Sequence, residues 1–294
     1  MSIYPWHEPT LRRLQDLCST SQLPNALALT CPLGWGHETL LAQVALLLLE
    51  VDGERQVDEF AHPDFRWITA DGAVIKIDQI RRLTEFAGQT PQKSCRKVAA
   101  ILDAHLLNPN AANALLKTLE EPPPNTHVVL ATPFWGKLLP TIRSRCQRFQ
   151  VNADITQARV WLQEKGLDIS QSTFAEYGHA PLSIAQSRHS GQIEITPWLA
   201  ELPRASLEVS LEPIMQGDKV NWLARWYRRV LLHLGGDSIP GCQGSAAALI
   251  GFSDELLLIR QQIETSNSAN ARLLIERLIV RWVQLNRVSG AKGP

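Results

Sequence analysis

The first 150 residues of this 294-residue chain alternate between short apolar runs and longer segments with helical periodicity. The apolar runs are rich in aliphatic side chains, which is typical of strands that are buried on both faces. We expect strands at residues 26–30, 65–69, 97–102, 127–132 and 148–151. Strands of this kind joined by helices predict a mostly parallel sheet that is covered by helices on both faces.

The segments between these strands are expected to be helices. Apolar positions recur with helical spacing over residues 39–50 and 76–89. A third helix should follow Asn108, because Asn is a favoured N-cap residue and Pro109 suits the first helical position. That helix should end where a run of three prolines begins at Pro122.

Strand signals disappear after residue 150. Asp154 followed by Gln157 resembles a capping box, and it opens a run of short helical segments typical of a small lid. The stretch before residue 205 contains Gly, Pro and Ser, as linkers do, and the rest of the chain carries two wide apolar helical faces. The expected parts are an α/β core over residues 1–150, a helical lid over 151–190, a linker over 191–204 and a helical domain over 205–294.

Composition and charge narrow the possible partners. The chain has 29 Lys and Arg and 29 Asp and Glu, so its formal net charge is zero. A nucleic-acid-binding domain usually carries a basic excess, and the chain as a whole has none. The N-terminus has no apolar leader, and the apolar run at residues 44–49 is far too short to span a bilayer. We expect a cytoplasmic protein without membrane association.

The five cysteines do not form a metal-binding pattern. They are Cys18, Cys31, Cys95, Cys146 and Cys242. No two have C-x-x-C spacing, and their odd number argues against a complete set of disulfides. Reduced thiols that pack as small apolar side chains are the simplest interpretation, so we predict no zinc site.

The segment after the first expected strand has the layout of a phosphate-binding loop without its chemistry. A working loop reads G-x-x-x-x-G-K-[ST]: backbone N–H groups cradle the phosphates, Lys reaches them and the hydroxyl binds Mg²⁺. Gly34 and Gly36 are present. Cys31 replaces the first Gly, His37 replaces the Lys and Glu38 replaces the hydroxyl residue. Since a carboxylate repels phosphate, the sequence predicts an NTPase-like fold that binds no nucleotide cofactor.

A second catalytic position is also degraded. Asp103 follows the strand at residues 97–102, where an ATPase of this kind holds its Mg²⁺. The attacking water also needs a positioning or basic group, and the next residue, Ala104, cannot supply one. Asp103 alone also suits a turn at the end of a strand. Two independent losses at one site nevertheless favour an inactive site.

Two further segments carry a family resemblance. Residues 113–123 read NALLKTLEEPP and residues 144–146 read SRC. This combination closely resembles the clamp-loader family of AAA+ proteins, in particular that of bacterial DNA polymerase III. The resemblance covers essentially the whole chain and is strongest over residues 97–149. It implies an α/β P-loop NTPase-like (AAA+) N-terminal domain, a small helical lid and an all-α C-terminal collar that holds subunits in a ring.

The resemblance also implies a role for Arg145, which forms the SRC motif with Ser144 and Cys146. In this family the Arg of the motif projects into the ATP site of a neighbouring subunit. A guanidinium is always charged and can engage two phosphate oxygens, so it stabilises the charge that develops on the γ-phosphate. We expect Arg145 to act as an arginine finger in trans, while the chain itself has no ATPase activity.

The chain departs from the family pattern in other places. The ATPase members carry a Glu where Ala104 stands and an Arg in the lid, whereas residues 178–182 contain no Arg. Many members carry a cysteine zinc module, but residues 50–64 contain no Cys. Thr132 occupies a polar sensor position at the end of a strand, although without phosphate it has little to sense. We expect neither a metal nor a cofactor.

The resemblance implies gamma or tau ATPase subunits and a delta subunit as partners, and it implies a sliding clamp and primed DNA as targets of the assembly. The chain would be a rigid, non-catalytic subunit of the ring. An active AAA+ ATPase with an atypical P-loop remains an alternative, in which His37 or a distant lysine supplies the cation and Thr39 reaches Mg²⁺. A general interaction scaffold is a third possibility, but it leaves the SRC and NALLKTLEEPP segments unexplained.

Overall fold

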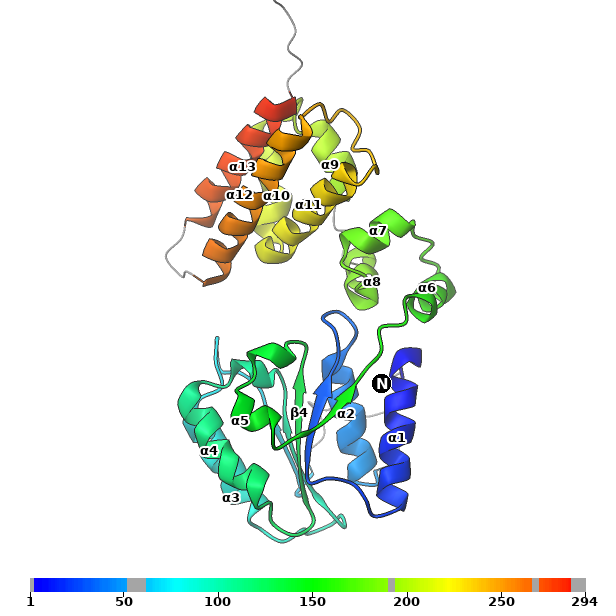
Figure 1. Cartoon of the computed structure of the whole chain (residues 1–294), viewed down its shortest axis with the longest axis vertical. Helices are drawn as coiled ribbons and strands as arrows, with labels where there is room; N and C mark the ends of the chain where they lie inside the picture. The colour runs from blue at the N-terminus through cyan, green and yellow to red at the C-terminus, as the bar shows by residue number, and fades with distance from the viewer. Residues whose placement is uncertain (1–2, 52–61, 190–193, 266–269, 287–294) are drawn as a thin grey trace, which may run out of the picture. The chain divides into compact units, whose positions relative to one another are not determined.

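A computed structural model of the chain describes residues 3–51, 62–189, 194–265 and 270–286 (Figure 1). They belong to two compact units, of which the first ends at Lys165 and the second begins at Gly166. Each unit has a buried apolar core of its own. Within the described ranges, no helix is both long enough and apolar enough to cross a membrane.

Five parallel strands form the sheet of the first unit, in the order β2-β3-β4-β1-β5. Their bounds are Ala26–Thr30 for β1, Phe65–Ile68 for β2, Lys97–Ile101 for β3, Thr126–Thr132 for β4 and Gln147–Gln150 for β5. The expected strands and the α/β class are therefore confirmed. Because the strands are parallel, the loops after β1, β3 and β4 leave the same edge of the sheet, where sheets of this type bind ligands.

Helices cover both faces of this sheet. The helices of this unit are α1 (Glu8–Ser19), α2 (His37–Leu48), α3 (Ile77–Ala87), α4 (Pro109–Glu120), α5 (Pro140–Arg143) and α6 (Ile155–Glu164), with 3-10 helices at Pro5–His7, Ala104–Leu106 and Trp135–Lys137. α1 and α2 lie on one side of the sheet, and α3 and α4 lie on the other (Figure 1). Asn108 caps α4 by accepting the N–H of Ala111 at 2.8 Å, as expected. Asp154 caps α6 in the same way.

The pleat of the strands separates two layers of core. Ala28 of β1 and Ile101 of β3 both lie beside Leu130 of β4, and all three belong to the core beneath α3 and α4. Neighbouring strand residues point to the opposite face, towards α2. Burial on both faces explains why these strands are continuous apolar runs in the sequence.

The second unit is entirely helical where it is described. Its helices are α7 (Gln171–Glu176), α8 (Pro181–His189), α9 (Ile195–Glu201), α10 (Leu207–Gln216), α11 (Lys219–Leu234), α12 (Ala246–Thr265) and α13 (Ala271–Asn286). Aromatic rings form the centre of its core. The ring of Trp226 lies 5.0 Å from that of Trp198, 5.3 Å from that of Phe252 and 6.0 Å from that of Trp282.

The expectation of a linker over residues 191–204 is wrong for the part that forms α9. Ile195, Trp198 and Leu199 are spaced as one face of a helix, and all three are buried. Pro197 lies in the first turn of α9, where the missing N–H disrupts no helical hydrogen bond. Packing of this short apolar face therefore outweighs a composition typical of linkers. Residues 191–193 lie outside the described residues.

A buried ion pair joins α7 to α11. Nε and Nη2 of Arg225 donate to Oε1 of Glu176 at 3.0 and 2.7 Å, and both side chains are almost fully buried. The same guanidinium lies over the ring of Tyr177, 4.1 Å from its centroid. Next to this pair, Gly178 has φ +66°, and a Cβ there would lie 2.9 Å from Cζ of Arg228. Gly therefore suits both the backbone and the crowded neighbour.

Asp64 organises the connection that enters β3. Its buried carboxylate accepts the backbone N–H groups of Gln92 and Lys93 at 2.7 Å and of Ser94 at 2.8 Å. Burial raises the pKa of this carboxyl, but the three donors outweigh burial and leave the pKa below its usual value. The predicted absence of a zinc module concerns the adjoining residues 50–64, of which 52–61 lie outside the described residues.

We expect Asp64→Asn to lower the free energy of unfolding by about 1.5–3 kcal/mol at pH 7, because an amide replaces a charged acceptor of three N–H groups. Since the folded pKa lies below the unfolded value of about 3.9, the carboxylate stabilises the fold above that pH and loses its effect as the pH falls further. Urea unfolding should therefore separate the variant from the parent less at pH 3 than at pH 7. Asp78→Asn, at an exposed position of α3, is the control and should change stability by less than about 0.5 kcal/mol. Equal losses in both variants would contradict this role for Asp64.

Candidate functional site: the loop between β1 and α2

The degenerate phosphate loop connects β1 to α2 at the carboxyl edge of the sheet. Gly34 has φ +77° and Gly36 has φ +84°, in the left-handed region that favours glycine. α2 begins at His37, directly after the second of these glycines. These two glycines, which match the layout of a phosphate loop, thus allow the backbone path of the loop.

The backbone of Trp35, in the middle of this loop, is already fully hydrogen-bonded. Its carbonyl oxygen accepts Nε1–H of Trp6 and Nε2–H of His7, each at 2.8 Å, and its own N–H donates to the carbonyl of Pro32 at 3.1 Å. Burial lowers the pKa of His7, which keeps this imidazole neutral at pH 7. A phosphate loop presents free N–H groups to its ligand, and the N–H of Trp35 is not free.

Aromatic side chains from three distant segments enclose the loop. Tyr4 and Trp6 precede α1, Trp35 lies in the loop, and Trp161 belongs to α6. Trp6 contacts the other three, with ring centroids 5.2 Å from Tyr4, 5.2 Å from Trp35 and 5.4 Å from Trp161. Trp6 and Trp35 are each 2% exposed. This cluster fixes the N-terminal segment, the loop and α6 to one another without any ligand.

His37, at the position of the phosphate-binding Lys, pairs with Asp103, at the position of the metal-binding acid. Nε2 of His37 lies 2.9 Å from Oδ1 of Asp103. This hydrogen bond is the main cause that lowers the pKa of Asp103, and burial opposes it. Asp103 has φ +50°, a left-handed conformation that Asp tolerates better than most residues. The two side chains that would serve phosphate and metal therefore satisfy each other.

The remaining polar groups of the site are also occupied. Nδ1 of His105 lies 3.1 Å from Oγ1 of Thr132 and 3.9 Å from Oδ1 of Asp103. Burial lowers the pKa of His105. Oγ1 of Thr132, at the expected sensor position, accepts the N–H of Phe134 at 3.0 Å. Ala104 is fully buried and brings no carboxylate to the site.

The other replaced loop positions differ in how far they reach solvent. Cys31 is buried, and burial raises its pKa to about 12, so its thiol stays protonated. Glu38 is exposed on the first turn of α2, while Thr39 is buried behind it. Among the residues that the structure describes, no cluster of three or more His, Cys, Asp or Glu is arranged to hold a metal ion.

Arg145 lies on a second surface of the same unit, between α5 and β5. Its Nε donates to Oε1 of Glu120 at 2.5 Å, and Nη2 forms an ion pair with the same oxygen. Nη1 donates to the carbonyl of Thr141 at 2.9 Å and to Oγ of Ser144 at 3.3 Å. The side chain is 32% exposed, so it remains within reach of solvent. Cys146 is buried, and burial raises its pKa to about 12.

Sequence reasoning identified the positions at both surfaces but not their contacts. The pairing of His37 with Asp103 and the two bonds from Trp6 and His7 to the loop were missed. The sequence held a signal for the first of these: His37 replaces the lysine and Asp103 retains the acid, and in an ATPase these two groups face the same ligand. Glu120 was likewise part of a quoted motif without an assigned partner.

We expect Trp6→Phe to lower the free energy of unfolding by about 2–4 kcal/mol, because the smaller phenyl ring leaves a cavity in the buried aromatic cluster and one buried hydrogen bond to the Trp35 carbonyl is lost. Amide hydrogens of residues 33–38 should also exchange faster by mass spectrometry. Trp67→Phe on β2 is the matched control, since the described residues give its indole N–H no acceptor. If exchange in the loop is the same in the Trp6 variant and in the parent, this bond does not hold the loop.

Comparison with known proteins agrees with this architecture. A family model described as DNA polymerase III, delta subunit, matches residues 6–154. The DNA polymerase III subunit delta' of Pseudomonas aeruginosa is 27% identical over 96% of this chain and 98% of its own length. The subunit delta' of Escherichia coli is 32% identical over 50% of this chain and 48% of its own length.

A solved structure extends the similarity to the fold. The chain is similar to a DNA polymerase III gamma subunit-related protein of Thermotoga maritima, with a TM-score of 0.57 and 18% identity. The match covers 95% of this chain and 100% of that one. The expected arrangement, a parallel α/β domain followed by helices, is therefore a fold that this solved protein shares. With half of its length matched by the family model and nearly all of it aligned with a delta' subunit, the chain belongs to the DNA polymerase III delta-subunit family, in its delta-prime branch.

Proposed function

We propose that the chain is a non-catalytic delta-prime subunit of a DNA polymerase III clamp loader and that its own P-loop site binds no nucleotide. The observation that carries this proposal is the 2.9 Å contact between Nε2 of His37 and Oδ1 of Asp103. It joins the two positions that an ATPase would use for phosphate and Mg²⁺. The closed backbone of Trp35 and the apolar Ala104 support the same conclusion.

The chemical contribution of the subunit would then be Arg145, acting on ATP held by a neighbouring gamma or tau subunit. An arginine finger raises NTPase rates by about 10³–10⁵ in well-studied systems. In the isolated chain its guanidinium is bound to Glu120, a half-exposed carboxylate that competes with a phosphate for the same donors. Docking against a neighbour would transfer Arg145 from this partner to the γ-phosphate.

The helical regions would hold the subunit in its ring. We propose the division into a core over residues 1–150, a lid over 151–190 and a collar over 205–294. Large apolar side chains remain exposed on two helices of the collar: Ile250 and Leu258 on α12, and Leu273 and Val280 on α13. Exposed apolar positions of this kind are typical of surfaces that associate.

The proposed partners follow from this role. They are gamma or tau ATPase subunits and a delta subunit in the ring, and the sliding clamp and primed DNA as targets of the whole cytoplasmic assembly. The balanced net charge of the chain suits a subunit whose own contact with DNA is small and directed to backbone phosphates.

Titration calorimetry of the isolated chain with Mg-ATP tests the inert site. We expect no binding heat at millimolar nucleotide, because Asp103 already holds the imidazole of His37 and the N–H of Trp35 in the middle of the loop is taken. Mg-ADP and metal-free ATP serve as parallel titrations. Binding in the micromolar range that requires Mg²⁺ would overturn the proposal and favour an active ATPase with an atypical P-loop.

Substitution of Arg145 tests the contribution in trans. In a loader reconstituted with its ATPase subunits, Arg145→Ala should lower the ATPase and clamp-loading rates at least about tenfold, while assembly and thermal stability stay the same. Arg145→Lys should restore little, since Lys cannot engage two phosphate oxygens in the same way. Glu120→Gln should leave the rate at or above that of the parent, because it only releases Arg145. Arg143→Ala is the neighbouring control, and an unchanged rate in Arg145→Ala would rule out a working finger.

A further inference from the structure

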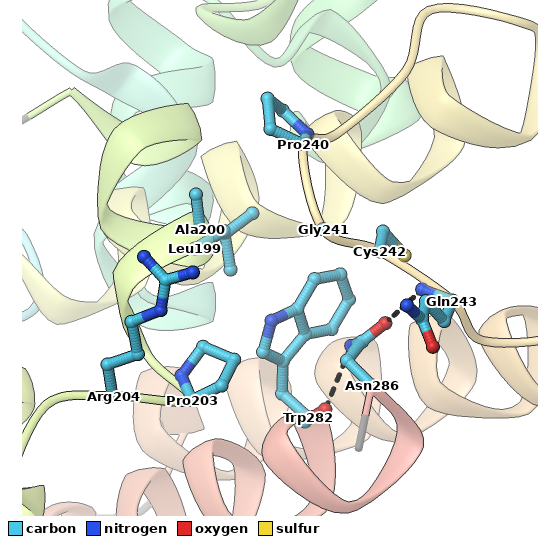
Figure 2. Close-up of a pocket in the computed structure, with 10 residues that line it drawn as sticks. All are labelled: Leu199, Ala200, Pro203, Arg204, Pro240, Gly241, Cys242, Gln243, Trp282 and Asn286. Carbon is cyan, nitrogen blue, oxygen red and sulfur yellow. Dashed lines mark hydrogen bonds between the residues drawn. The ribbon is translucent and has the colours of Figure 1, made fainter. Parts of the chain in front are cut away.

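A cavity of about 350 Å³ lies in the second unit (Figure 2). Its walls come from α9, from the turn that follows α9, from residues 240–243 and from the end of α13. Leu199, Pro203 and Pro240 make it largely apolar. The volume is at the lower end of the range found for ligand sites in proteins.

The wall formed by α13 presents an unpaired donor. Trp282 is 1% exposed, and its carbonyl accepts Nδ2–H of Asn286 at 2.8 Å, but its indole N–H has no acceptor among the described residues. In Figure 2 the indole nitrogen is on the side of the ring that faces Arg204. The ring is held in place by Phe252 and Trp226, whose centroids lie 5.4 and 6.0 Å away. Because this N–H meets only the solvent of the cavity, it is available to an acceptor from outside.

The opposite rim of the cavity presents a second unpaired donor, the guanidinium of Arg204. Arg204 is exposed, and its side chain forms no ion pair or hydrogen bond with any residue that the structure describes. No Asp or Glu lines the cavity. The amide oxygen of Asn286 is already used, since it accepts the N–H of Gln243 at 2.8 Å and that of Gly244 at 3.3 Å. The cavity therefore offers an apolar wall, an N–H and a guanidinium, and no carboxylate of its lining neutralises that guanidinium.

A smaller hollow of about 200 Å³ adjoins this cavity along α13. The two share Pro203, and the second is lined by Val280, Val283 and Leu207. Two apolar hollows side by side on one helix suit an extended chain whose alternate side chains point the same way. A compact metabolite would fill only one of them.

We propose that this pair of hollows binds a short extended segment of another protein, with two apolar side chains and an acidic residue. The apolar side chains fill the hollows on either side of Pro203. The carboxylate is bound by the guanidinium of Arg204, and an oxygen of the segment accepts the indole N–H of Trp282. Charge complementarity selects the ligand, because the charge in the lining is the cation of Arg204 and no lining carboxylate opposes it. The site does not depend on the nucleotide chemistry of the first unit.

The peptide acetyl-Leu-Asp-Leu-amide is a suitable probe, with acetyl-Leu-Asn-Leu-amide as its matched control. We would titrate each into the full chain labelled with ¹⁵N at tryptophan and follow the indole N–H signals. The acidic peptide should shift the Trp282 signal, which Trp282→Phe identifies by its loss, and the Asn peptide should bind about tenfold more weakly. Sodium acetate in the same buffer should not reproduce the shift, and if it does, the site is an anion site only and the proposal fails.

Three variants of the full chain complete the test. Arg204→Gln should weaken the acidic peptide about tenfold and should leave the Asn peptide unaffected. Val280→Ser should weaken both peptides if the second hollow is used. Arg81→Gln, an exposed arginine of α3 in the first unit, is the control of equal charge and should change nothing. Equal affinity for the two peptides, or no effect of Arg204→Gln, would overturn the proposal. A Trp282 signal that moves with protein concentration alone would assign the hollows to a second copy of the chain instead.

Discussion

A loop built to surround phosphate must satisfy its own backbone and charges when no phosphate is bound, and this constraint shapes the first unit. The carbonyl of Trp35 is held by Trp6 and His7, and the imidazole of His37 is held by Asp103. Buried polar groups without partners would otherwise destabilise the fold by about 1–3 kcal/mol each. The N-terminal segment, the aromatic cluster and the end of β3 are therefore arranged around the loop as a ligand would arrange them.

The two arginine–carboxylate pairs outside the loop differ in how deeply they are buried. Arg225 and Glu176 are buried together, so each depends on the other for its solvation. Arg145 and Glu120 are only partly covered, and water or a phosphate can replace either partner at small cost. The first arrangement makes a fixed joint within the helical unit. The second keeps the guanidinium of Arg145 ordered but available to another partner, as the role proposed for it in trans requires.

The sequence predicts the first unit well because its signals are local. β1, β3 and β4 are buried, largely apolar runs, and Asn108 and Asp154 cap their helices through residues two or three positions away. The errors and omissions involve contacts that local patterns do not encode. α9 was missed because only burial against α11 and α13 distinguishes its short apolar face from a linker. The pairs His37 with Asp103 and Arg145 with Glu120 join residues that are far apart along the chain and meet only through the sheet topology.

The buried ion pair between α7 and α11 restricts which substitutions related chains can accept. Removal of either Glu176 or Arg225 alone leaves a buried charge without a counterion, at a cost of about 3–5 kcal/mol, whereas replacement of both by apolar residues can be neutral. Gly178 adds a third dependence, because the space that a side chain would need there is taken by Arg228. A substitution at one of these positions is therefore tolerated only together with a compensating substitution at another. In the history of this lineage, positions 176 and 225 should behave as one inherited unit, and they should mark common descent more reliably than the freely varying surface around them.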